Sequence, residues 1–243
     1  MDLIPIGIAN SVFKTTDYDW IKTIEFANQL KISILQLHIG QFDPEYNWSI
    51  KICNFSEVYL HLFTDTNCSQ LPLETINRNL KTPILIQHER YIQLKDIEFF
   101  KNNQLSLGYE NDQDKLLGDY FSSLNDLHRH KLNITAIIDF PRFFHQFLAK
   151  HSEQDVYNQI INILIWCRDN HIPVILHAID INDYDPHVSK WVPLFSGILP
   201  WNKFLKFVLN ESIPIKSIIF EYEDTINTEK SVYSLREWFK NYQ

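Results

Sequence analysis

The sequence is poor in glycine, with only 5 among 243 residues. Loops that cradle phosphates need closely spaced glycines, and the chain contains neither a GxGxxG nor a GxxxxGK[ST] pattern. It also lacks a run rich in Lys and Arg, and its formal net charge is -8. An acidic chain without a basic run disfavours nucleic acid as a partner, because the phosphate backbone would be repelled.

Cysteines and long apolar runs are scarce as well. The three cysteines are odd in number and widely spaced, which fits reduced thiols better than a disulfide framework. No run reaches the roughly 18 apolar residues of a membrane-spanning helix. The N-terminal stretch also lacks the basic start and apolar centre of a signal peptide. We therefore expect a cytoplasmic protein that does not enter a membrane.

What the chain does contain is eight short apolar runs with mostly helical patterns between them. Strands are expected at 3–9, 32–40, 58–65, 83–89, 105–111, 134–140, 173–180 and 216–223. Helical patterns occupy 17–31, 112–131, 152–170, 201–211 and 229–242, while the segments after the third and fourth runs are short enough for single helical turns. Continuous apolar runs are typical of parallel strands covered on both faces. Their alternation with helices predicts an α/β fold, a single (β/α)8 TIM barrel, and no linker divides residues 1–243 into further domains.

Carboxylates and an imidazole stand where the last four strands end. Glu110 ends the run in "LGYEND", Asp139 ends "ITAIID", His177 follows "PVIL", and Glu221 follows "IIF". Active sites of such barrels lie at the C-terminal ends of the strands. Three carboxylates packed together need a cation among them, and oxygen ligands with one imidazole suit Mn²⁺, Mg²⁺, Co²⁺ or Zn²⁺. Glu223 obeys the same alternation as Glu221 and is its rival on the last strand.

The order Glu, Asp, His, Glu on strands five to eight resembles the xylose isomerase-like barrel superfamily. That group includes sugar and sugar-phosphate isomerases and epimerases, dehydratases of inososes, and the endonuclease IV type of AP endonuclease. The segments that carry the resemblance are "LGYEND", "IIDFPRFFH", "PVILHAID", "DPHVSKWVPLFSGILPWNKFLKFV" and "IIFEYE". Two features depart from the family pattern. Arg142 stands where a histidine usually follows the aspartate by three residues, and the linker keeps a single glycine, Gly197.

The resemblance implies that Glu110, Asp139, His177 and Glu221 bind one divalent metal ion. It also implies that Glu110 and Glu221 act as the acid–base pair that moves a substrate proton by way of an enediolate. The residues expected to contact substrate are His88, Arg142, His187 and Trp191. Apolar faces for a sugar ring are expected from Trp191, Trp201, Phe140 and Phe144. Two further histidines, His38 and His61, are interpreted as structural, with a place in the lining of the pocket as the alternative.

The function predicted from the resemblance is a metal-dependent isomerase or epimerase of a small sugar, sugar phosphate or keto-polyol. Two alternatives stay open. One is an AP-endonuclease-like metal-dependent phosphodiesterase, and the other is a barrel without catalysis that acts as a binding protein. The expected partner is a small carbohydrate. The 6 Trp and 17 Phe are compatible with a homo-oligomer as well.

Overall fold

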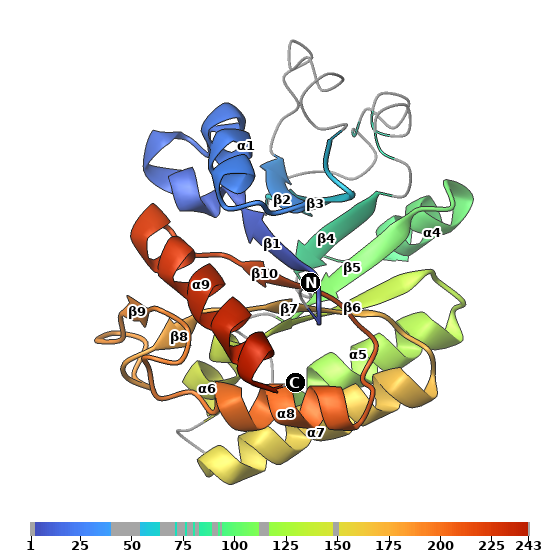
Figure 1. Ribbon diagram of the computed structural model, residues 1–243. Helices are drawn as coiled ribbons and strands as arrows, with labels where there is room; N and C mark the ends of the chain where they lie inside the picture. The colour runs from blue at the N-terminus through green and yellow to red at the C-terminus, as the bar shows by residue number, and fades with distance from the viewer. Residues whose placement is uncertain are drawn as a thin grey trace.

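A barrel of eight parallel strands forms the centre of the molecule. The computed structural model describes residues 3–39, 54–63, 71, 76, 80, 83–88, 92, 94–111, 117–147 and 151–242. The barrel is closed in the order β1–β10–β7–β6–β5–β4–β3–β2, and the helices lie around its outside (Figure 1). The barrel strands are β1 (Ile6–Ala9), β2 (Ile34–Ile39), β3 (Glu57–Leu62), β4 (Ile84–His88), β5 (Ser106–Glu110), β6 (Ile134–Asp139), β7 (Val174–His177) and β10 (Ile215–Phe220).

Each of the eight apolar runs overlaps one barrel strand, so the predicted (β/α)8 barrel is confirmed. The prediction that residues 1–243 form one domain stays a prediction. The expected strand over 173–180 is shorter than predicted, because β7 ends at His177 and Asp180 begins another pair of strands. That pair, β8 (Asp180–Ile181) and β9 (Trp191–Val192), is antiparallel and separate from the barrel.

The expected helices are present, with ends that the sequence signals explain. The helices in the described part of the chain are η1 (Asn10–Thr16), α1 (Trp20–Gln29), α4 (Leu94–Asn102), α5 (Leu117–Arg129), α6 (Phe140–Phe147), α7 (Glu153–Asp169), α8 (Trp201–Asn210) and α9 (Thr225–Tyr242). Asp19 caps α1 by accepting the N–H of Lys22 at 3.0 Å, and Ser152 with Asp155 forms a capping box at α7. None of the described helices combines the length and the apolar character needed to cross a membrane.

The expectation of a single helical turn after the fourth strand is wrong. Helix α4 has 9 residues there, because Phe100 and its neighbours have helical spacing that buries one face against the barrel. Most of the segment after β3, at 64–70, 72–75 and 77–79, lies outside the described residues, so the same expectation for that segment has no outcome.

Side chains fill the inside of the barrel in layers, and the layers change from apolar to polar toward the C-terminal strand ends. The apolar interior consists of Ala9, Ile34, Tyr59, Ile84, Ile86, Ile137, Ile175 and Ile219. Beyond it, the strand register pairs His38 with His61, His88 with Glu110, and Asp139 with His177. Because paired residues of parallel neighbours point to the same side of a sheet, these six polar side chains gather above the apolar interior.

Candidate metal centre

Glu110, Asp139, His177 and Glu221 meet at the C-terminal ends of β5, β6, β7 and β10. All four are buried, and the most accessible, Glu221, is 9% exposed. Each offers one ligand atom, and these atoms lie within 4.8 Å of one another. His177 Nδ1 is 3.2 Å from Glu110 Oε1 and 3.1 Å from Glu221 Oε2. The four strand-end residues singled out in the sequence therefore form one buried group, whose role as metal ligands stays a prediction.

Glu221 belongs to this group, whereas its rival Glu223 lies elsewhere. The side chain of Glu223 is 41% exposed and forms an ion pair with Lys14 at the surface. The two glutamates are separated by one residue, Tyr222, which is completely buried. The chain leaves the barrel after Phe220, so alternation along the strand no longer brings both carboxylates to the same place.

Gln36 on β2 holds two members of the group, and sequence reasoning missed it. Its amide nitrogen donates to Glu221 Oε1, and its Oε1 accepts from His177 Nε2 at 2.9 Å. A glutamine oxygen can only accept, so His177 carries a proton on Nε2 and turns Nδ1 toward the carboxylates. The available signal was a polar amide in a largely apolar run, two residues from Ile34 and from His38 and so on their strand face.

Arg142 lies across two of the predicted metal ligands. Its Nη1 is 3.0 Å from Glu110 Oε1, and its Nε is 3.0 Å from Asp139 Oδ2. It also donates to the Asn111 carbonyl at 3.2 Å and to His88 Nδ1 at 2.9 Å. Arg142 was expected to contact substrate. The structure places its guanidinium among the carboxylates, where it already supplies one positive charge.

The pKa values of the group follow from burial and these contacts. Burial opposes a charge on His177, but the carboxylates of Glu221 and Glu110 outweigh it and raise the His177 pKa to about 10. Burial also opposes ionised Glu221, yet His177 lowers its pKa to about 2. Burial acts the same way on Glu110, but His88 and Arg142 hold its pKa well below the usual range.

Asp139 is the exception among the carboxylates, because burial raises its pKa to about 6 against the opposing effect of Arg142. At neutral pH all three carboxylates are therefore ionised, while His177 and Arg142 are positively charged. Three negative and two positive charges leave the buried group with a net negative charge. Such a group attracts a further cation.

Three more imidazoles line the same end of the barrel. His61 Nε2 lies 2.7 Å from Glu110 Oε2, and His88 Nδ1 lies 3.8 Å from the same oxygen. The ring centroids of His38 and His61 are 4.4 Å apart, and those of His61 and His88 are 5.0 Å apart. His38 and His61 were interpreted as structural, with a place in the pocket as the alternative. The register of β2, β3 and β4 brings both beside the carboxylates.

Two buried asparagines fix the loops around this group. Asn111 donates to the Asp139 carbonyl at 3.1 Å and accepts the Asp139 N–H at 2.7 Å, which ties the ends of β5 and β6 together. Asn10 accepts the His38 N–H at 2.7 Å and donates to the Tyr18 carbonyl at 3.0 Å. These bonds satisfy backbone groups where the strands end, so the site rests on a rigid frame.

The remaining predicted substrate residues are less closely associated with the group. His187 lies in the loop that connects β8 with β9, and Trp191 is the first residue of β9. The Trp191 side chain is 37% exposed. The expectation that a sugar ring would lie against Phe140, Phe144 and Trp201 is wrong. They are at most 1% exposed and pack on one another, with 4.5 Å between the ring centroids of Phe140 and Trp201. Helix α6 begins at Phe140 without an intervening loop, which turns the rings of Phe140 and Phe144 into the core, where Phe140 meets Trp201 of α8.

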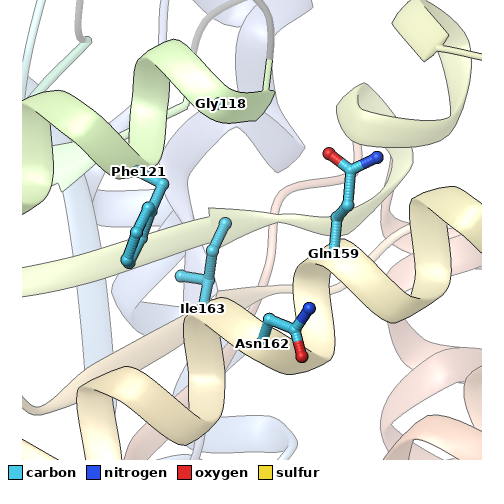
Figure 2. Close-up of a pocket in the computed structure, with 5 residues that line it drawn as sticks. All are labelled: Gly118, Phe121, Gln159, Asn162 and Ile163. Carbon is cyan, nitrogen blue, oxygen red and sulfur yellow. The ribbon is translucent and has the colours of Figure 1, made fainter.

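A separate hollow on the outside of the barrel has no comparable chemistry. It has a volume of about 230 Å³ and lies between α5 and α7, lined by Gly118, Phe121, Gln159, Asn162 and Ile163 (Figure 2). None of these side chains titrates or binds metals strongly. The candidate site is therefore the group of residues at the strand ends.

Neither a protein-family model nor a curated protein matches the sequence. Solved structures do match the fold. A xylose isomerase domain protein from Planctomyces limnophilus is similar over 98% of this chain and 97% of its own, with 12% identity and a TM-score of 0.62. The probable 3-DHS dehydratase AsbF from Bacillus anthracis is similar over 96% and 99%, with 13% identity and a TM-score of 0.64. The IOLI protein, whose structure holds a zinc atom, is similar over 98% and 96%, with 11% identity and a TM-score of 0.54. The chain has the fold of the xylose isomerase-like barrels.

Proposed function

We propose that this chain is a divalent-metal-dependent isomerase or epimerase of a small sugar, sugar phosphate or keto-polyol. The observation that carries the proposal is the buried group of Glu110, Asp139, His177 and Glu221 at the catalytic end of the barrel. The fold shared with a xylose isomerase domain protein, and with a barrel that holds zinc, supports it.

The donor set of the group fits one divalent ion. It offers three carboxylates and one imidazole, and Gln36 already directs His177 Nδ1 toward Glu110 and Glu221. Mn²⁺, Mg²⁺, Co²⁺ and Zn²⁺ all accept such ligands. When bound, the ion would polarise a carbonyl and a neighbouring hydroxyl of the substrate and stabilise the enediolate that deprotonation produces.

Glu110 and Glu221 are the residues proposed to move the proton. They approach His177 Nδ1 from β5 and from the end of β10, which are separated in the barrel by β6 and β7. Both are ionised at neutral pH, so either can take a proton from the carbon beside the carbonyl. In an isomerase, the glutamate that has taken the proton returns it to the neighbouring carbon. In an epimerase, the glutamate on the opposite face starts ionised as well, so it has to take a proton from solvent before it protonates that face.

Neighbouring residues would orient the substrate. Arg142 and His88 contact one another at 2.9 Å on the Glu110 side of the group, and both present hydrogen-bonding nitrogens there. We propose that they position substrate oxygens. His187 and Trp191 remain proposed substrate contacts from the hairpin.

Metal content and hydrogen exchange test this proposal. Purified protein would be loaded with each of the four ions and incubated in D₂O with a panel of aldoses, ketoses and their phosphates. NMR would then follow deuterium entry next to the carbonyl. Glu110→Gln and Glu221→Gln should each lower metal-dependent exchange by about 10²–10⁴-fold, the usual contribution of an acid–base group. Glu223→Gln is the matched control and should leave exchange unchanged. If the two site variants keep wild-type metal content and exchange, the proposal is wrong.

A phosphodiesterase of the AP endonuclease type is the second candidate, favoured by one specific observation. His61, His88 and Glu110 also offer ligand atoms within 4.8 Å of one another, and Glu110 belongs to both groups. Two ions sharing a carboxylate would suit phosphodiester hydrolysis by a bound water. The net charge of -8 counts against a long nucleic acid. Cleavage of abasic-site DNA that is abolished by a chelator would favour this candidate over the isomerase.

A barrel without catalysis is the third candidate. The observation in its favour is that Arg142 and His177 already neutralise most of the negative charge of the group. Absence of bound metal after loading with all four ions, measured on folded protein, would favour this candidate and contradict the first two.

A further inference from the structure

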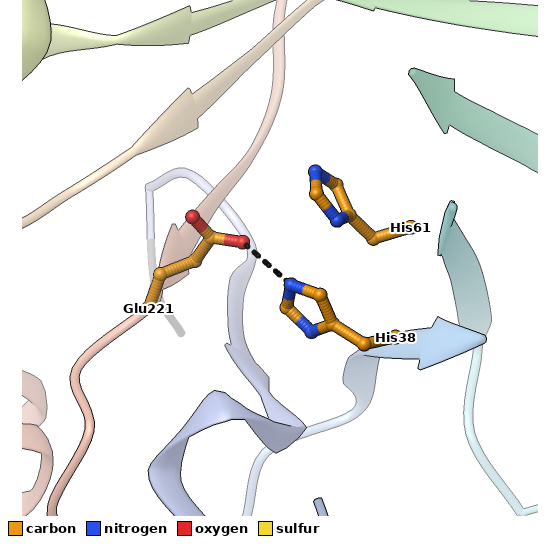
Figure 3. A group of neighbouring side chains, drawn as sticks. All are labelled: His38, His61 and Glu221. Carbon is orange, nitrogen blue, oxygen red and sulfur yellow. Dashed lines mark ion pairs between the residues drawn. The ribbon is translucent and has the colours of Figure 1, made fainter. Parts of the chain in front are cut away.

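We propose a second divalent-cation site beside the four-residue group, formed by His38, His61 and Glu221. Each residue offers one ligand atom, and the three atoms lie within 4.8 Å of one another. Figure 3 shows His38 and Glu221 pointing at each other from β2 and from the end of β10, with His61 on β3 beside them. The inference goes beyond the proposed function, because it needs only these three residues and no isomerase activity.

The first argument is the tautomer of His38. Its Nδ1 lies 2.9 Å from Asn10 Oδ1. The amide of Asn10 is oriented by its other end, since Asn10 Nδ2 donates to the Tyr18 carbonyl at 3.0 Å. The oxygen can only accept, so His38 carries its proton on Nδ1, and Nε2 presents a lone pair. Imidazoles that bind metals usually donate their other N–H to a carbonyl or carboxylate oxygen in this way.

The second argument is the position of that lone pair. His38 Nε2 lies 4.0 Å from Glu221 Oε1, and it has no hydrogen-bond partner among the described residues. This distance is too long for a hydrogen bond, and both atoms carry lone pairs, so nothing attractive joins them directly. Zinc bonds to imidazole nitrogen and carboxylate oxygen are roughly 2.0–2.2 Å each, so one ion fits between the two atoms.

The third argument is an unsatisfied nitrogen on His61. Its Nε2 is engaged by Glu110 at 2.7 Å, whereas its Nδ1 is buried without a hydrogen-bond partner in the described part of the chain. The His61 side chain is only 6% exposed. Buried polar atoms are nearly always satisfied, so an orphan imidazole nitrogen in this group points to a missing ligand.

The rings around His38 hold it in the orientation that the site needs. The centroids of Tyr18, His61 and Phe63 lie 5.1, 4.4 and 5.6 Å from that of His38. Two imidazoles and one carboxylate favour Zn²⁺ or Co²⁺ over Mg²⁺. The Glu221 carboxylate would then serve both sites, because Oε1 faces His38 while Oε2 faces His177.

Zinc stoichiometry in single variants tests the inference. Folded protein, checked by circular dichroism, would be stripped with chelator, titrated with Zn²⁺ and analysed for bound metal. The wild type should bind two ions, His38→Phe one, Asp139→Asn one, and the exposed control His130→Phe two. Two ions in His38→Phe would overturn the inference. The inference would also be overturned if the second ion were lost in His88→Phe but still bound in His38→Phe. That ion would then be held by the alternative group of His61, His88 and Glu110.

The same titration separates this inference from the proposed function. If the wild type binds one ion that Asp139→Asn keeps and His38→Phe loses, the second site stands and the four-residue site fails. If that one ion is lost in Asp139→Asn and kept in His38→Phe, the second site is refuted.

If the His38→Phe variant does not fold, ¹⁵N-histidine NMR of the wild type tests the second site instead. Zinc should shift the Nε2 resonance of His38, and an unchanged resonance at saturation would refute the site.

Discussion

Replacing Arg142 by glutamine tests whether this arginine occupies the place of a metal ion. Its guanidinium lies 3.0 Å from both Glu110 and Asp139, whose side chains are 0% and 6% exposed. Removing one partner of a buried ion pair costs about 3–5 kcal/mol, because an uncompensated charge stays behind. For a chain of this length, each kcal/mol lost from the free energy of unfolding lowers the melting temperature by about 2–4 °C. The metal-free variant should therefore melt roughly 6–20 °C below the metal-free wild type.

A divalent ion should reverse much of this loss. At a hundred times its Kd, an ion that binds only the folded state adds about 2.7 kcal/mol. The glutamine variant should also bind the ion about tenfold more tightly than the wild type, an effect of about 1.4 kcal/mol. The reason is that Glu110 and Asp139 no longer have to be freed from the guanidinium before they bind metal.

Urea unfolding followed by circular dichroism, with chelator and with Mn²⁺ or Zn²⁺, measures both effects. Arg129→Gln is the matched control, because Arg129 pairs with Asp126 at 3.7 Å on the surface and both side chains are more than 60% exposed. That exposed pair should contribute nothing measurable. The reasoning is refuted if Arg142→Gln costs less than about 1 kcal/mol in chelator, the range of an exposed pair. It is also refuted if metal stabilises wild type and variant equally.

Three further changes have expected outcomes. Gln36→Leu removes the bond that orients His177 and should weaken metal binding about 10–100-fold in equilibrium dialysis, with Gln36→Glu giving no rescue. Gly197→Ala would place a methyl group 2.3 Å from Asp180 Oδ1 and should destabilise the fold by about 1–3 kcal/mol in urea, whereas Gly118→Ala, with open space around it, should not. The pKa of His177 is raised to about 10, so its ion pairs should stabilise the metal-free protein fully below pH 6.5. That stabilisation should be lost as the pH rises through 10, and the His177→Gln variant should lack this pH dependence.

The barrel could be predicted from the sequence because its strands are buried on both faces. The run 134–140 is largely apolar, and its one charged residue, Asp139, stands next to its end, so both the strand and its polar end are visible. Counting two residues at a time along each strand shows which residues share a face with Glu110, Asp139 and His177, and the barrel hypothesis makes that face the inner one. The prediction needed no knowledge of distances between strands.

The residues that were missed depend on register between strands. A lone histidine or glutamine within an apolar run resembles a satisfied core residue, as His38, His61 and Gln36 do. Only the pairing of β2 with β3 shows that the two histidines lie side by side, and only barrel closure brings Gln36 next to Glu221. Contacts across the barrel join residues that are 185 positions apart, and local sequence patterns carry no information on them.

Arg142 changes the chemistry that the four predicted ligands imply. Helix α6 starts directly at the end of β6, so a residue three positions after Asp139 turns back over that carboxylate, where the Arg142 N–H also bonds Asp139 Oδ1 at 3.1 Å. With Arg142 in place, a metal ion has to compete with a cation of the chain itself and with the proton on His177. Metal binding should therefore release a proton and strengthen as pH rises toward 10. Arg142 and His177 leave the metal-free group with only one uncompensated negative charge, so the folded barrel can exist before the ion arrives.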